Sequence, residues 1–125
     1  MSAGNDNTQI HAEERYYEAL DQVADGQFAE AVRSFRACLA TDPAYLDAMH
    51  GLIRALQELG DLDEAIRTAL HLSAIDPEDV LVHTSLSILY QRKGMVPEAE
   101  AEALKAKLLG WKHQLRLSQD PPEGQ

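Results

Sequence analysis

Histidine, cysteine and paired carboxylates are the side chains of this sequence that could do chemistry. Its five histidines never recur at His-x-x-x-His spacing, and its one cysteine, Cys38, has no second thiol beside it for a zinc site. His11 and Glu14, three residues apart, could supply two metal ligands, but a solvated pair near a chain end is far commoner. Carboxylate pairs such as Asp63-Glu64 act as acid and base only where one pKa is perturbed, and stabilisation of a helix start explains them better. We therefore predict no catalytic residue and no metal site.

Glycine motifs that bind phosphate groups or present an acyl-transfer nucleophile are also missing from the sequence. Neither Gly-x-x-x-x-Gly-Lys, nor Gly-x-Gly-x-x-Gly, nor Gly-x-Ser-x-Gly occurs. We therefore expect a protein that is not an enzyme and that needs no cofactor.

Composition and charge narrow the fold and the partner. The 125 residues have a net charge of −10 at pH 7, which repels phosphate backbones and argues against a nucleic-acid partner. The charge is uneven: residues 1–90 hold 16 acidic and 5 basic side chains, and residues 91–125 hold 5 and 6. An aromatic content of 6%, with abundant alanine and leucine, favours helices over a β-sandwich. We predict one all-α domain.

Two features indicate where the protein is found. Residues 1–8 are polar and acidic, without a basic start or an apolar stretch, so we expect neither a signal peptide nor a membrane span. Cys38 cannot form an intrachain disulfide, which fits a reducing compartment, and its expected role is that of a small buried side chain. We predict a cytoplasmic protein.

One pattern recurs in the sequence with a period of 34 residues. Gly-x-apolar-x-Glu-Ala begins at Gly26, at Gly60 and at Gly94. Glycine suits the residue that follows a helix end, because it adopts the left-handed backbone conformation at little cost. Each copy therefore predicts a helix, a tight turn at the glycine, and a second helix.

Polar punctuation sets the helix boundaries. Asp61 and Glu64 have the spacing of a capping box. The pairs at 42–43 and 76–77 are Asp-Pro, and we expect Asp as N-cap and Pro at the first helical position of the next helix. These signals predict six helices, at 10–24, 28–41, 45–58, 62–74, 79–92 and 96–109. The repeats then cover 10–43, 44–77 and 78–111, with an end-helix extension to about 117 and disordered segments at 1–9 and 118–125.

This pattern resembles the tetratricopeptide repeat (TPR) family over about residues 10–111. In the second copy the family's positions are filled by Leu52, Ile53, Leu56, Gly60, Leu62, Ala65, Ala69, Leu72 and Pro77. The first copy departs in its first helix, where Glu18 and Gln22 replace a leucine and an aromatic residue, and Tyr16, Leu20 and Val23 form an alternative inward face. The resemblance implies a right-handed α-solenoid of three helical hairpins with a C-terminal capping extension.

The resemblance also implies a function. In this family the first helix of each hairpin lines a concave groove that accepts a peptide or a helix of a partner protein. The corresponding residues here are Tyr16, Leu20, His50, Arg54, Gln57, Thr84, Ile88, Gln91 and Arg92. Arg54 and Arg92 are cations in an acidic protein, and guanidinium groups bind carboxylates well, so we expect a partner with an acidic group. The alternative for Arg54 is an ion pair with Glu58 of its own helix.

The end of the chain suggests a second contact surface. Leu104, Leu108, Trp111 and Leu115 continue at helical spacing across Gly110. We expect this segment to cap the stack. The alternative is that Trp111 and Leu115 face outward and make the protein a structural or self-associating subunit, so both monomer and homodimer stay open.

Overall fold

The computed structural model describes the backbone of residues 2–119 and the side chains of residues 8–119. Within this range the chain forms helices and no strand. The helices are α1 (Ser2–Ala24), α2 (Phe28–Thr41), α3 (Leu46–Leu59), α4 (Leu62–Ile75), α5 (Val80–Arg92) and α6 (Val96–Gln119). The all-α prediction is confirmed, and each end of the four inner helices lies within one residue of its predicted place.

The two outer helices are longer than predicted. Residues 2–9 were expected to be disordered, but α1 begins at Ser2, and no proline interrupts the chain before residue 43. Helix α6 continues to Gln119 because its repeat has Gly110-Trp111 where the other two have Asp-Pro. The predicted disordered tail therefore starts inside a helix at residues 118 and 119, and its residues 120–125 lie outside the described part of the chain.

The repeated glycines adopt the predicted conformation. Gly26, Gly60 and Gly94 have φ angles of 76°, 80° and 76°. After α3, the Gly60 N–H donates to the carbonyl of Gln57 at 3.0 Å, which satisfies an end carbonyl of the helix. Asp61 then caps α4, because its side chain accepts a hydrogen bond from the Glu64 N–H at 3.4 Å.

The Asp-Pro pairs have a different role from the one predicted. Asp42 and Asp76 follow the last residues of α2 and α4, and their side chains accept bonds from the N–H groups two residues later, at 3.1 Å and 3.3 Å. They therefore form turns, in which aspartate competes well for backbone N–H groups. The N-cap of α5 is Asp79, whose side chain accepts from the Val82 N–H at 3.2 Å.

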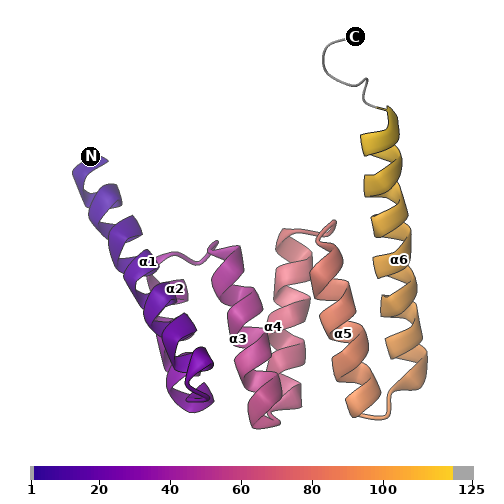
Figure 1. Cartoon of the computed structure of the whole chain (residues 1–125), viewed down its shortest axis with the longest axis horizontal. Helices are drawn as coiled ribbons and strands as arrows, with labels where there is room; N and C mark the ends of the chain where they lie inside the picture. Colours follow the sequence, from indigo (N-terminus) through magenta and orange to yellow (C-terminus); the bar gives the residue numbers. More distant parts are fainter. Residues whose placement is uncertain (1, 120–125) are drawn as a thin grey trace.

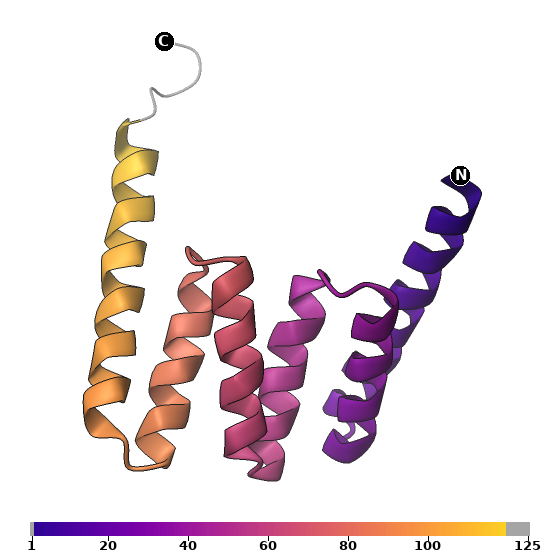
Figure 2. The same ribbon diagram turned by 180° about the vertical axis from the view of Figure 1, so that it is seen from behind.

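The helices form a curved row (Figures 1 and 2). Each helix packs against the next one along the chain, and α1 also contacts α3, as α3 contacts α5. Among the described helices, α2, α4 and α6 do not contact one another. The first helices of the three hairpins are therefore the closer set, and their side of the row is concave.

The core lies between the hairpins and includes one very close contact. Phe35 of α2 is fully buried, and a Cβ atom added to Gly51 of α3 would lie 2.3 Å from its Cζ atom. Cys38 is also fully buried, as predicted, and burial, aided by the charge of Asp42, raises the pKa of its thiol to about 11.

Helix α1 packs through small residues and a polar contact. Ala12 and Ala19 are fully buried, whereas Leu20 is 39% exposed and does not belong to the inward face. The polar residues that depart from the repeat pattern face a buried serine of α2: the Ser34 hydroxyl donates to Gln22 Oε1 at 2.7 Å and lies 3.2 Å from Glu18 Oε1. This contact satisfies the polar groups at a position where the family has apolar side chains.

Candidate partner-binding groove

A pocket of about 490 Å³ opens on the concave side of the row. Helix α3 forms its centre, with α1 on one side and α5 on the other. Its lining consists of Tyr16, Asp47, His50, Gly51, Ile53, Arg54, Gln57, Glu58, Leu81 and Ser85. The pocket thus has an apolar component, one cation that is always charged, and two carboxylates.

The structure gathers some of the predicted groove residues and separates the others. Four of the nine line the pocket: Tyr16, His50, Arg54 and Gln57. The remaining five lie outside its lining: Leu20, Thr84, Ile88, Gln91 and Arg92. Three of these five are the 34-residue equivalents of His50, Arg54 and Gln57, but they lie on α5, beside which no further first helix packs in the described chain.

Sequence reasoning missed six of the lining residues. They are Asp47, Gly51, Ile53, Glu58, Leu81 and Ser85. A signal for the last two was present, because Leu81 and Ser85 stand 34 residues after Asp47 and Gly51. The predicted set of groove residues was therefore too small. A pocket between neighbouring helices is lined by the sides that both helices turn toward it, and the prediction took only one row of residues from each helix.

Arg54 is the available cation of the pocket. Its side chain is exposed and makes no hydrogen bond or ion pair with the described part of the chain. Glu58 lines the same pocket, but the alternative ion pair between Arg54 and Glu58 is not formed. A guanidinium group in this state can bind a carboxylate without first breaking an internal contact.

Two polar contacts hold α3 and α5 together at either end of the pocket. His50 Nε2 lies 2.6 Å from Asp79 Oδ2 at the beginning of both helices. At their other end, the Arg92 guanidinium donates to the carbonyl of Gln57 at 3.0 Å, where the negative end of the α3 dipole favours a cation. Arg92 therefore bridges two helices and does not accompany Arg54 in the pocket.

The side of the pocket formed by α1 is aromatic. The ring centroids of Tyr16 and Tyr45 lie 5.1 Å apart, and these residues have the same 29-residue separation as His50 and Asp79. The same pair of positions is thus filled by two tilted aromatic rings in the first case and by a polar pair in the second. Burial, followed by the charge of Asp47, raises the pKa of Tyr16, so its phenol stays neutral.

Comparison with known proteins decides the family. The family model described as tetratricopeptide repeat matches residues 22–89, more than half of the chain. This chain belongs to the tetratricopeptide repeat family. No curated protein sequence matched it.

Solved TPR-like structures resemble the chain over most of its length. The type III secretion translocator chaperone SycD of Yersinia enterocolitica is 24% identical, with a TM-score of 0.75 over 78% of this chain and 73% of that one. MamA is 23% identical, with a TM-score of 0.81, and the match covers 86% of this chain and 62% of MamA. PcrH of Pseudomonas aeruginosa is 20% identical, with a TM-score of 0.75 over 78% of this chain and 74% of that one. These likenesses establish the fold.

The C-terminal extension of the TPR stack makes polar contacts and leaves its apolar residues uncovered. Lys112 Nζ lies 2.6 Å from one carboxylate oxygen of Glu78, and Arg116 Nη1 lies 3.3 Å from the other, so α6 contacts the loop between α4 and α5. Trp111 and Leu115, the residues proposed for the alternative contact surface, are 53% and 62% exposed. Lys107 Nζ lies 5.1 Å from the centroid of the Trp111 ring.

The groups with potential for metal chemistry stay apart in this TPR chain. His11 and Glu14 approach to 3.9 Å with side chains 70% and 68% exposed, as expected for a solvated pair. In the described residues, no three His, Cys, Asp or Glu side chains gather closely enough to hold a metal ion. None of the six described helices combines the length and apolar character that a bilayer crossing requires.

Proposed function

We propose that this chain is a non-catalytic adaptor or scaffold that binds a peptide or helical segment of a partner protein in its concave groove. The observation that carries the proposal is the pocket between α1, α3 and α5, which exposes an unpaired guanidinium group beside apolar side chains. Two neighbours support it by analogy: SycD was solved with a peptide of the translocator YopD, and PcrH with the chaperone-binding region of PopB.

The lining favours a particular segment chemistry. Arg54 suits one carboxylate of the partner, and Tyr16 and the exposed Leu81 suit apolar side chains beside it. Asp47 and Glu58 line the same pocket and would repel a second acidic group. The proposed ligand is therefore a segment with a single acidic residue among apolar ones, and no nucleic acid.

A cytoplasmic location and a monomeric or homodimeric state complete this proposal. The free thiol of Cys38 is compatible with a reducing compartment.

The test is peptide selection followed by affinity measurement. Peptides selected from a random library on the wild-type chain are titrated by fluorescence anisotropy against wild type, Arg54→Glu and Arg33→Glu. Arg33 is a matched control, because it is an exposed arginine of α2 outside the pocket, and both variants change the net charge equally. We expect Arg54→Glu to weaken binding by about tenfold or more, since a charge-assisted hydrogen bond is lost and a repulsion is added. Equal affinities of Arg54→Glu and wild type would contradict the proposal.

A third variant addresses the alternative surface. Trp111→Ala should leave the affinity unchanged, because Trp111 lies outside the groove. Circular dichroism establishes that every variant is folded. If Trp111→Ala abolished binding while Arg54→Glu did not, the end of α6 would be the contact surface.

A further inference from the structure

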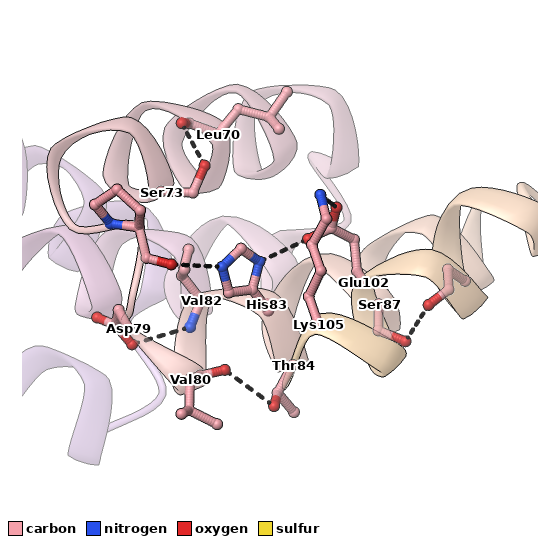
Figure 3. Close-up of polar contacts among 12 residues, drawn as sticks. Leu70, Ser73, Asp79, Val80, Val82, His83, Thr84, Ser87, Glu102 and Lys105 are labelled. Carbon is pink, nitrogen blue, oxygen red and sulfur yellow. Dashed lines mark hydrogen bonds and ion pairs between the residues drawn. The ribbon is translucent and has the colours of Figure 1, made fainter. Parts of the chain in front are cut away.

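A buried histidine and a buried glutamate meet at the interface of α5 and α6. His83 is 7% exposed and Glu102 is 8% exposed. His83 Nδ1 lies 2.8 Å from Glu102 Oε1, and His83 Nε2 lies 3.2 Å from the carbonyl oxygen of Pro77 in the loop between α4 and α5. Figure 3 shows the imidazole ring in this position, with Glu102 and Lys105 on the side of α6. The groove and its pocket do not involve this pair.

The two partners of the imidazole ring are both acceptors. A neutral imidazole has one N–H group, so it can donate to Glu102 or to the Pro77 carbonyl, but not to both. If it donates to Glu102, the lone pair of Nε2 faces the lone pairs of the carbonyl oxygen. A protonated ring donates to both and pairs its charge with the carboxylate. Because the pKa of Glu102 is lowered and its carboxylate is an acceptor, both contacts are hydrogen bonds only when the ring is protonated.

The preceding repeat shows that the fold does not require this pair. Met49 and Thr68 stand 34 residues before His83 and Glu102. Met49 is 2% exposed and packs in the core, and Thr68 bonds within its own helix, donating to the carbonyl of Glu64 at 3.0 Å. An apolar side chain and a short hydroxyl thus fill the equivalent space. The charged pair is specific to the last hairpin.

We propose that His83 and Glu102 form a proton-dependent lock, which holds α6 against α5 and the preceding loop more tightly at mildly acidic pH than at alkaline pH. A neutral ring can keep only one of the two hydrogen bonds, to Glu102 or to the Pro77 carbonyl. The first turn of α5 is then held less firmly to Glu102 of α6 or to the preceding loop. The contacts among α1 to α4 do not involve this pair.

The other charged groups around the imidazole ring come from α6 and the loop. Lys105 Nζ lies 3.0 Å from the second carboxylate oxygen of Glu102. A second pocket, separate from the groove, lies beside His83, and Lys105, Lys112 and the uncharged Ser73 of α4 belong to its lining. Lys112 also forms an ion pair with Glu78. Neither lysine contacts the ring nitrogens, so neither replaces the proton.

The carboxylate sets the acidic limit of the lock. Burial raises the pKa of Glu102, but hydrogen bonds from His83 and Lys105 outweigh this effect, and the pKa lies below its ordinary value. The contribution of Glu102 is thus present above the ordinary carboxyl pKa and is lost as pH falls through the lowered one. Only the protonated ring donates to both acceptors, so the proposed lock needs an imidazolium ring and an ionised Glu102 together.

The chain itself supplies the matched variant, because His83→Met/Glu102→Thr copies the preceding repeat. Urea unfolding is measured at about pH 5.5 and about pH 8, a range that spans the titration of histidine. Between these values we expect the folded-to-unfolded ratio of wild type to fall on the order of tenfold further than that of the double variant. The exposed-histidine control His71→Gln should behave as wild type. Equal pH dependence in wild type and the double variant would overturn the proposal.

A conservative variant and a local measurement keep the test decisive if the double variant does not fold. Glu102→Gln retains the size of the side chain and removes its charge, so its stability should change less with pH than that of wild type. Amide hydrogen exchange, expressed as protection relative to the unfolded chain, should show that the change is concentrated in residues 96–119. An unaltered pH dependence in Glu102→Gln would also overturn the proposal.

Discussion

Gly51→Ala tests whether the hairpins approach as closely as the structure has them. The added methyl group would lie 2.3 Å from Phe35 Cζ and 2.4 Å from Cε1, well inside van der Waals contact. Phe35 is fully buried in the core. The backbone of α3 or the ring of Phe35 must therefore shift.

The expected magnitude follows from two opposing effects. Overpacking of a filled core costs about 1–3 kcal/mol, and the shortness of this contact favours the upper part of that range. Alanine offsets up to about 1 kcal/mol of this loss, because it is a better helix former than glycine. The net decrease in the free energy of unfolding is about 1–2 kcal/mol, or about 4–8 °C in Tm for a domain of this size.

The assay is urea and thermal unfolding followed by circular dichroism, with a control from the same chain. Gly110 also lies inside a helix, but a Cβ atom there would meet nothing within 4 Å. Gly110→Ala should therefore raise the stability by up to about 1 kcal/mol. Combining Gly51→Ala with Phe35→Leu should cost less than the sum of the two single changes. If Gly51→Ala were as stable as wild type, the close approach of α2 and α3 would be refuted.

Three further predictions follow from buried or capping side chains. Iodoacetamide at about pH 8 should label Cys38 far more slowly in the native chain than in urea, because the thiol is buried and its pKa is raised to about 11. Labelling is followed by mass spectrometry, and fast labelling of the native chain would contradict this prediction. Asp79→Ala should lower the free energy of unfolding by about 1–2 kcal/mol, because it removes both the cap of α5 and the partner of His50. Asp79→Asn should lower it less, because asparagine keeps the cap. Equal decreases for the two variants in urea unfolding would be inconsistent with the cap. Ser34→Ala should cost about 1 kcal/mol in the same assay, and no change would show that its bond to Gln22 is unimportant.

The inner helices were predictable because local signals fix their ends. A glycine with positive φ closes three of the helices, and its position in the sequence is unambiguous. The Asp-Pro pairs were harder to interpret, since aspartate accepts hydrogen bonds equally well in a turn and at a helix start. In the structure, the Asp42 side chain accepts a hydrogen bond from the Ala44 N–H, which identifies a turn and not a helix N-cap. The sequence alone does not distinguish these two roles.

The ends of the two outer helices, α1 and α6, were predicted less well, because no residue that stops a helix marks where they begin or end. Residues 2–9 are polar, which suggested disorder, yet nothing in them stops α1. At α6 the apolar spacing across Gly110 did predict a continuation, to within about two residues of the observed end. The spacing alone could not show that Trp111 and Leu115 stay exposed, because burial depends on what packs against them.

The groove was predictable as a face but not as a set of available groups. Repeat periodicity placed His50, Arg54 and Gln57 on one side of α3, and all three line the pocket. The contacts that occupy His50 and Arg92 come from residues 29 and 35 positions away and depend on how α3 and α5 pack. Only the packed structure therefore distinguishes Arg54, which is unpaired, from Arg92, which bridges two helices.

The most direct test of the central claim is NMR chemical-shift mapping of a selected peptide on the 15N-labelled chain. The claim is that partners bind the concave side formed by the first helices of the hairpins. We expect the largest shifts around Tyr16, in residues 47–58 and in residues 81–85, which supply the pocket lining. Shifts confined to α2 and α4, or to residues 104–115 of α6, would contradict the proposed function.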